Sequence, residues 1–194
     1  GNFLDKSKIE YTKFSDEDLV KNVANLLSQD EIVGWFQGRM EFGPRALGNR
    51  SILANPKNPK MKDIVNKKVK HREEFRPFAP AILTEKASKY LTYDYDSPFM
   101  TINFETNSDT RKNIISATHI DGTARVQTVS RERNKKFYDL IKEFENITDA
   151  PALLNTSFNV KGEPIVCSPE DAYNCFMNTE INYLVLGNYL ISKD

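Results

Sequence analysis

The stretch PALLNTSFNVKGEPIVCSPEDAYNCF (residues 151–176) contains the two kinds of element that decide the fold class. Its apolar start, Pro151 to Leu154, predicts a buried strand that ends at a polar turn. Ser168, followed by Pro169 at the first helical position and by two acidic residues, is a strong signal for the start of a helix. A buried strand followed by a helix is typical of an α/β protein.

The same alternation continues on both sides of this stretch. Ser15 is expected to cap a helix, because three acidic residues follow it and apolar residues then recur at helical spacing. Prolines at positions 77 and 80 predict an extended segment. The remaining elements are predicted at residues 32–36 (strand), 61–69 (helix), 84–91 (short helix), 134–144 (helix), 183–186 (strand) and 189–191 (strand). The sequence therefore predicts one α/β domain with a mixed sheet and flanking helices.

Three regions are less regular. Residues 1–14 are polar and unpatterned, and we expect them to be a tether from a missing N-terminal domain, with residues 15–194 forming the folded domain. Residues 92–113 are rich in Tyr, Asp and Asn and predict an irregular excursion that could act as a flap. Residues 116–120 and 124–130 predict two strands joined by an Asp121-Gly122 turn.

Composition excludes several classes of protein. Of the 194 residues, 39% are hydrophobic and 28% are charged, which is the balance of a folded globular chain rather than a disordered one. Apolar runs stay well below the roughly 18 residues of a membrane span, and the N-terminus lacks the apolar core of a signal peptide. The two cysteines match neither a disulfide framework nor a zinc pattern. We therefore expect a cytoplasmic protein without membrane partners.

The charge is balanced overall but unevenly distributed. The chain has 27 basic and 27 acidic residues. Between Arg39 and Arg76, however, 11 basic residues stand against 4 acidic ones, a local excess of +7. One strongly basic third in a neutral protein favours a localised anion site over a nucleic-acid-binding surface.

The segment GRMEFGPRALGNRS (38–51) places Arg39, Arg45 and Arg50 among three glycines. Glycine permits close approach of the backbone, and arginine binds phosphate or carboxylate oxygens in a bidentate way. The segment therefore suits an anionic ligand held in a loop, although it contains neither GxxxxGK[ST] nor GxGxxG. The alternative is a basic surface turn.

Two further segments supply cations. KHREEFRPFAP (70–80) contains Lys70, Arg72 and Arg76, and Lys70 and Arg72 would share one face of an extended chain. Two cations on one face repel unless an anion lies between them; the alternative is a solvated basic helix end. HIDGTARVQTV (119–129) places Arg125 in a predicted strand, where it is either an anion ligand or a surface ion-pair partner.

The segment LLNTSFNVKGEPI (153–165) brings Asn155, Ser157 and Asn159 to a strand end, where ligands of α/β proteins bind. The alternative is a turn that satisfies its own backbone. No Ser-His-Asp order supports Ser157 as a nucleophile. The acidic residues show no paired spacing, so we predict no protein metal site.

Taken together, five segments in this order and spacing resemble the C-terminal domain of the carbamoyltransferases that modify nodulation factors and antibiotics. These segments are QGRMEFGPRALGNRSILANP (37–56), VKHREEFRPFAPAIL (69–83), HIDGTARVQTV, LLNTSFNVKGEPIV (153–166) and SPEDAYNCF (168–176). The resemblance implies a YrdC-like fold, a twisted open α/β sheet shared with threonylcarbamoyl-adenylate synthases. Residues 15–194 would then be a YrdC-like domain.

The resemblance also implies site residues. The fingerprint of YrdC-like domains is Lys-x-Arg followed by Ser-x-Asn, present here as Lys70-His71-Arg72 and Ser157-Phe158-Asn159. By this resemblance the catalytic residues would be Lys70, Arg72, Arg45 and Ser157. The residues that bind the nucleotide and the carbamoyl group would be Arg39, Arg76, Arg125, Asn155 and Asn159.

The implied activity is ATP-dependent O-carbamoylation. The domain would bind ATP and carbamoyl phosphate, with Mg²⁺ expected, and form carbamoyl-adenylate for transfer by an upstream actin/hexokinase-like domain of the same protein. Two alternatives stay open: a threonylcarbamoyl-adenylate synthase for tRNA modification, and a non-catalytic module that binds nucleotide or RNA. The first alternative does not account for the FGPRALGNR and FRPFAP segments. The second is not favoured, because the sequence lacks the interleaved aromatic residues of an RNA-binding surface.

Overall fold

The computed structural model describes residues 2–73, 76–93 and 95–193. In chain order its elements are α1 (Asn2–Lys6), β1 (Thr12–Lys13), α2 (Asp16–Ser28), β2 (Val33–Phe36), β3 (Arg50–Ala54), α3 (Met61–Val65), the π-helical turn η1 (Asn66–Lys70), β4 (Ala79–Leu83), η2 (Thr84–Lys89), β5 (Phe104–Glu105), η3 (Arg111–Asn113), η4 (Ile115–Ala117), β6 (Thr123–Ala124), β7 (Gln127–Val129), α4 (Lys135–Thr148), β8 (Ala152–Ser157), α5 (Pro169–Met177), β9 (Tyr183–Leu186) and β10 (Tyr189–Ser192).

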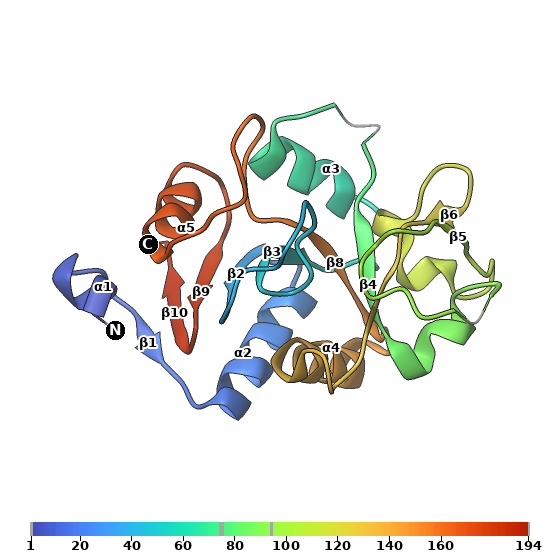
Figure 1. Ribbon diagram of the computed structural model, residues 1–194, viewed down its shortest axis with the longest axis horizontal. Coiled ribbons are helices and arrows are strands. Elements are labelled where there is room, and N and C mark those ends of the chain that lie inside the picture. The colour runs from blue at the N-terminus through green and yellow to red at the C-terminus, as the bar shows by residue number, and fades with distance from the viewer. Residues whose placement is uncertain (1, 74–75, 94, 194) are drawn as a thin grey trace.

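A mixed sheet runs through the centre of the molecule (Figure 1). Within the described residues it has eight strands in the order β1-β10-β9-β2-β3-β8-β4-β7. β2 pairs with β9, and β4 with β7, in parallel, whereas the other neighbours are antiparallel. The predicted single α/β domain with a twisted mixed sheet and flanking helices is confirmed.

Helices cover both faces of this sheet. α2 and α4 lie side by side against one face, and α3 and α5 lie on the other (Figure 1). Neighbouring residues of β3 show how strand alternation builds the two layers: Leu53 joins the cluster around Trp35 and Phe137, whereas Ile52 joins the cluster around Phe158 and Phe176. Both clusters consist of buried side chains, so the sheet is fixed in register from both sides.

The helix starts follow the capping signals of the sequence. The Ser15 side chain accepts a hydrogen bond from the main-chain nitrogen of Asp18, and Asn134 caps α4 in the same way. Ser168 and Asp171 form a reciprocal capping box at α5, with Pro169 at the first position. In the described part of the chain no helix has both the length and the apolar character needed to traverse a bilayer.

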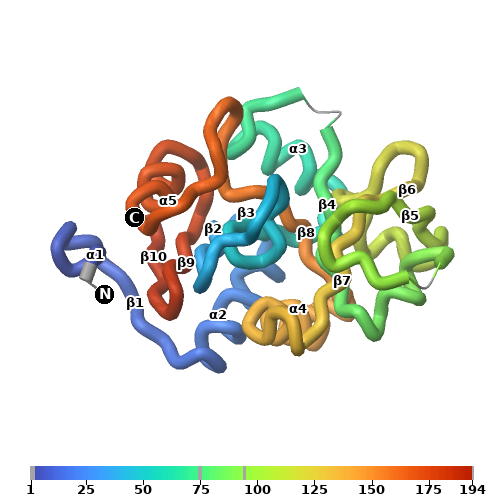
Figure 2. The backbone as a smooth tube through the Cα atoms, viewed as in Figure 1, coloured from blue at the N-terminus to red at the C-terminus, as the bar shows by residue number. Residues whose placement is uncertain are grey.

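The predicted hairpin at residues 116–130 does not form, although β7 lies within its second predicted strand, residues 124–130. Residues 115–117 form the 3-10 turn η4 instead, because both the main-chain nitrogen and the hydroxyl of Ser116 bond to the carbonyl of Pro56. β6 pairs with β5, and β7 pairs with β4 in the main sheet. The segment from β5 to β6 lies at the end of the molecule beyond β4, as the tube in Figure 2 shows.

The N-terminal residues are not without structure, contrary to expectation. α1 places Leu4 in the core, and β1 pairs with β10 as an edge strand of the sheet. Leu4 and Ile9 are the apolar residues that the overall polarity of this segment conceals. The assignment of residues 1–14 as a connection to a preceding domain stays a prediction.

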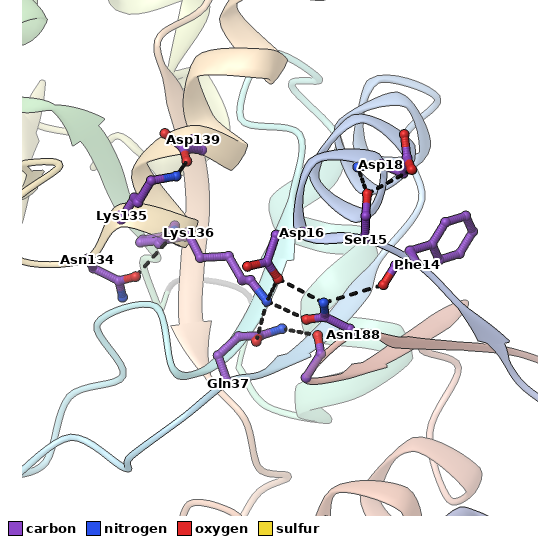
Figure 3. A network of polar contacts seen from close by, with 12 residues as sticks. Phe14, Ser15, Asp16, Asp18, Gln37, Asn134, Lys135, Lys136, Asp139 and Asn188 are labelled. Carbon is purple, nitrogen blue, oxygen red and sulfur yellow. Dashed lines mark hydrogen bonds and ion pairs between the residues drawn. The ribbon is translucent and has the colours of Figure 1, made fainter. Parts of the chain in front are cut away.

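A polar network ties the start of α2 to the rest of the domain (Figure 3). The Lys136 ammonium lies 2.7 Å from Asp16 Oδ1 and donates to Asn188 Oδ1 at 2.6 Å. Gln37, which follows β2, donates from Nε2 to the carbonyl of Gly187 at 2.8 Å. The network therefore fixes the first residue of the loop between β2 and β3.

Candidate anion-binding site

Several strands begin or end at the same end of the sheet. β2 and β8 end there, and β3, β4 and β7 begin there, as the register pairs Phe36 with Arg50, Ser51 with Ser157, and Ala81 with Gln127. The segments singled out in the sequence are the connections at these ends. Antiparallel pairing of β2, β3, β8 and β4, and parallel pairing of β4 with β7, thus bring together segments that are far apart in the chain.

A small cavity of about 80 Å³ lies at this point. Its lining consists of Pro44, Arg45, Ala46, Arg72, Pro77, Phe78, Ala79, Met100, Arg125, Asn155, Thr156 and Ser157. Larger hollows of about 630, 570 and 500 Å³ lie elsewhere, and none of them is lined by an arginine. The chemistry of the side chains, rather than the size of the hollow, therefore identifies the candidate site.

Three arginines line the cavity, and its lining contains no carboxylate among the described residues. Burial lowers the pKa of Arg125, and the positive charge of Arg45 adds to this shift. Burial also lowers the pKa of Arg72, with Arg76 and Arg125 contributing. Like charges held together in a half-buried space favour the binding of an anion.

Arg72 reaches the cavity from a strained turn rather than from a strand. Lys70 ends the π-helical turn η1, and His71 is left-handed with φ of +46°. The Arg72 guanidinium lies over the Phe78 ring at 4.7 Å from its centroid, and its Nε donates to Asn66 Oδ1 at 2.9 Å. The expectation that Lys70 and Arg72 share a strand face is thus corrected.

Lys70 lies behind the cavity wall and is only 3% exposed. Its ammonium donates to the main-chain oxygen of Ser157. It also donates to the main-chain oxygen and to Oδ1 of Asn159, at 2.9 Å in each case. Burial lowers its pKa to about 7, and the charge of Arg72 adds to the shift. The Lys-x-Arg and Ser-x-Asn pairs are therefore in direct contact across the sheet end.

Two buried polar atoms of the cavity residues have no partner in the described part of the chain. They are Oδ1 of Asn155, an acceptor, and Nε of Arg125, a donor. Asn155 uses its Nδ2 group within the protein, donating to the carbonyl of Ala46 at 3.2 Å and to Gln127 Oε1 at 2.9 Å. A buried polar atom without a partner costs about 1–3 kcal/mol, so these two atoms are candidates for hydrogen bonds to a bound group.

The loop between β2 and β3, which carries Arg45, is held from inside by Glu41. Glu41 Oε1 accepts hydrogen bonds from the main-chain nitrogens of Leu47 and Asn49 at 2.7 Å and of Arg50 at 3.3 Å. Glu41 is one of the acidic residues that show no paired spacing in the sequence. Its role in the loop could not be found from the sequence, because these main-chain donors reach the carboxylate only when the loop folds back on itself.

Arg50 also supports this loop and does not line the cavity. It is 4% exposed, lies over the Phe36 ring at 3.5 Å, and donates to the carbonyls of Gln37 and Gly38. Gln127, which lies within the predicted strand at residues 124–130, donates to the carbonyl of Leu47 at 2.9 Å. These residues position the site without lining it.

Three predicted ligands lie outside the cavity lining. Arg39 is exposed on the β2–β3 loop, and Arg76 is exposed with its Nε 3.1 Å from Glu73 Oε2. Asn159 accepts from Lys70 and from the hydroxyl of Ser157 and donates to the carbonyl of Glu163. The structure therefore gathers Arg45, Arg72, Arg125, Asn155 and Ser157, with Lys70 and Asn159 directly behind Ser157.

The residues present do not fit a protein-held magnesium site. No group of three or more His, Cys, Asp or Glu side chains with metal-binding geometry occurs in residues 2–73, 76–93 and 95–193. The polar side chains of the cavity lining are three arginines, the amide of Asn155 and the hydroxyls of Thr156 and Ser157, with no carboxylate among the described residues. A divalent cation would thus depend on the oxygens of a bound phosphate.

Fold and site together define an α/β domain that gathers arginines and amides at one end of a mixed sheet. Residues 24–193 match the family described as Carbamoyltransferase C-terminus. The chain belongs to this family, as its motifs suggested.

Sequence relatives agree with this assignment. The chain is 48% identical over 203 residues to an uncharacterized protein of Synechocystis, covering 94% of this chain and 33% of that protein. It is 46% identical over 182 residues to nodulation protein NolO of Bradyrhizobium diazoefficiens, covering 91% of this chain and 33% of that protein. The chain thus spans about a third of the length of these curated relatives.

Solved structures share the fold at low identity. HypF in its phosphate- and nucleotide-bound form is 18% identical, with a TM-score of 0.59 over 94% of this chain and 22% of that one. P. abyssi Sua5 complexed with L-threonine is 13% identical, with a TM-score of 0.64 over 91% of this chain and 48% of that one. The YrdC-like fold is confirmed by these neighbours.

Proposed function

We propose that this domain binds ATP and carbamoyl phosphate and forms carbamoyl-adenylate for an ATP-dependent O-carbamoyltransferase. Transfer to the acceptor would take place on a separate actin/hexokinase-like domain of the same protein, which would act in the cytoplasm. Membership of the carbamoyltransferase family supports this proposal, as does the nucleotide-bound form of the structural neighbour HypF. The roles of individual residues below belong to the proposal.

The single observation that carries the proposal is the pair of unsatisfied atoms, Asn155 Oδ1 and Arg125 Nε. A carbamoyl group has an NH₂ donor for the amide oxygen and a carbonyl acceptor for the guanidinium. The oxygens of the α- and β-phosphates of a nucleotide can only accept hydrogen bonds and would leave Asn155 Oδ1 unpaired. The cavity of about 80 Å³ suits a group of few heavy atoms, with the nucleotide extending outside it.

The arginines suit the chemistry of adenylation. Carbamoyl phosphate first gives up phosphate to water and leaves carbamate. A carbamate oxygen then attacks the α-phosphorus of ATP, the bond from that phosphorus to the bridging oxygen breaks, and pyrophosphate leaves. Negative charge grows on the α-phosphate and on the leaving group, and preplaced Arg45 and Arg72 would stabilise it. Removal of one such donor commonly costs roughly 10²- to 10³-fold in rate.

The test is ATP–pyrophosphate exchange that depends on carbamoyl phosphate, measured in the full-length protein. We expect exchange in the wild type and a loss of at least roughly 100-fold in Arg45→Ala. Arg131→Ala is the matched control, because Arg131 is an exposed arginine whose partner is Asp139 at 3.4 Å. Equal exchange rates in the two variants would contradict the assignment of this cavity as the site of adenylation.

The alternative of threonylcarbamoyl-adenylate formation is tested in the same assay. Threonine and bicarbonate replace carbamoyl phosphate. Exchange supported by threonine and bicarbonate, with carbamoyl phosphate inert, would overturn the proposal. RNA binding that weakens steeply with salt in a protein without ATP binding would favour the non-catalytic module.

A further inference from the structure

We propose that Gln127 is a positioning residue that sets the specificity of the cavity by fixing the orientation of the Asn155 amide. This inference rests on the proposed function. It goes beyond that function because it explains why an acceptor, rather than a donor, is left for the ligand. Gln127 is 4% exposed and does not line the cavity, so it acts through Asn155.

The orientation follows from a chain of hydrogen bonds that begins at a main-chain carbonyl. The carbonyl of Leu47 can only accept, and Gln127 Nε2 donates to it at 2.9 Å. The other end of the Gln127 amide is therefore Oε1, and it faces Asn155. An oxygen there requires a donor, so Asn155 must present Nδ2.

A second main-chain carbonyl supports the same orientation. Asn155 Nδ2 also donates to the carbonyl of Ala46, at 3.2 Å. Both hydrogens of the Asn155 amide are thus used within the protein, and Oδ1 is left buried without a partner among the described residues. If the amide of Asn155 rotated by half a turn, two oxygens would face each other at Gln127, which is unfavourable.

The consequence is a preference for a ligand that carries an N–H donor. Carbamoyl phosphate and acetyl phosphate share the phosphate and the carbonyl, but acetyl phosphate has a methyl group in place of NH₂. A buried acceptor opposite a methyl group stays unsatisfied, and such mismatches cost about 5- to 150-fold in binding. We expect the wild type to prefer carbamoyl phosphate by a factor of this order in the exchange reaction.

Gln127→Leu removes the oxygen that orients Asn155, while its side chain has a similar size. The preference for carbamoyl over acetyl phosphate, measured as the ratio of exchange kcat/KM values, should fall severalfold, because only the carbonyl of Ala46 then holds the orientation of Asn155. Gln127→Glu keeps an acceptor for Asn155 Nδ2 but loses the donor to the carbonyl of Leu47, so it should keep most of the preference at a lower stability. If Gln127 had a merely structural role, the substitution would lower kcat/KM for both substrates by the same factor and leave their ratio unchanged.

The outcomes separate this inference from the function on which it rests. Asn155→Ala should abolish the preference. If Asn155→Ala abolishes the preference but a folded Gln127→Leu variant keeps the wild-type ratio, the inference is overturned and the proposed function stands. If Gln127→Leu does not fold, Gln127→Met replaces it and the same ratio decides. If the wild type shows no exchange with carbamoyl phosphate, the proposed function fails and this inference fails with it.

Discussion

The ammonium group of Lys70 and the side chain of Asn159 are bonded directly, with Nζ 2.9 Å from Oδ1, although 89 residues separate them in sequence. The same ammonium also donates to the main-chain oxygens of Ser157 and Asn159. The Ser157 hydroxyl oxygen lies 3.4 Å from the same ammonium, so a lysine held by four protein oxygens supports the turn that follows β8. Within the proposed site this contact keeps the Ser157 side chain at the cavity.

Lys70 gives the stability of the domain a distinct dependence on pH. Burial lowers its pKa from 10.5 to about 7 in the folded state. Between these values the unfolded chain binds the proton more tightly, so the free energy of unfolding should rise with pH, by at most ~1.4 kcal/mol per pH unit. Below the folded pKa both states are protonated and the dependence ends. Urea unfolding at a series of pH values measures this slope.

The control for this prediction is Lys70→Met, which should show no such rise between about pH 7.5 and about 8.5. This window avoids Cys175, whose pKa is raised by burial to about 11 and which would contribute a slope of opposite sign. Only the slope is compared, because Lys70→Met also changes the level of stability. An equal slope in wild type and variant would show that another group causes the effect.

Glu41 should control both the stability of the β2–β3 loop and the rate of exchange. In Glu41→Ala three main-chain N–H groups lose their acceptor, and we expect a loss of about 1–3 kcal/mol in unfolding free energy. Exchange should fall as well, because Arg45 is carried by the same loop. Glu41→Gln keeps one oxygen and should retain most of both properties. Urea unfolding and the exchange assay measure the two effects.

A double-mutant cycle with Arg45→Ala shows whether Glu41 acts through the loop. If it does, adding Glu41→Ala to Arg45→Ala should lower the exchange rate little further. Independent, multiplicative losses would contradict this route.

Gly48 should be intolerant of any side chain. Its φ of +104° is unfavourable for other residues, and a Cβ atom would lie 2.3 Å from Cδ1 of the Phe137 ring. We therefore expect Gly48→Ala to cost more than about 2 kcal/mol of unfolding free energy. Gly43 is the matched control, because its φ is +115° but nothing among the described residues lies within 4 Å of its added Cβ.

Gly43→Ala should therefore show the backbone cost alone, about 1 kcal/mol. Urea unfolding of both variants measures the difference. Equal losses would mean that the contact with Phe137 relaxes at no cost.

Much of the fold could be predicted because the signals are local. Ser15, Asn134 and Ser168 begin helices where the sequence places them, since a cap needs only residues within three positions. The pairing of β6 and the burial of Leu4 could not be predicted in this way. Each depends on partners from distant segments, β5 in one case and the core cluster around Phe158 and Phe176 in the other.

The sequence by itself determined the α/β class, the helix starts and the inventory of cations and amides, because periodicity, capping and composition are properties of neighbouring residues. Only the tertiary structure decided which cations meet. Arg45, Arg72 and Arg125 share a cavity, whereas Arg39 and Arg76 lie on the surface and Lys70 lies behind the wall. The physical reason is that strand register across the sheet, set by burial on both faces, decides which loops converge.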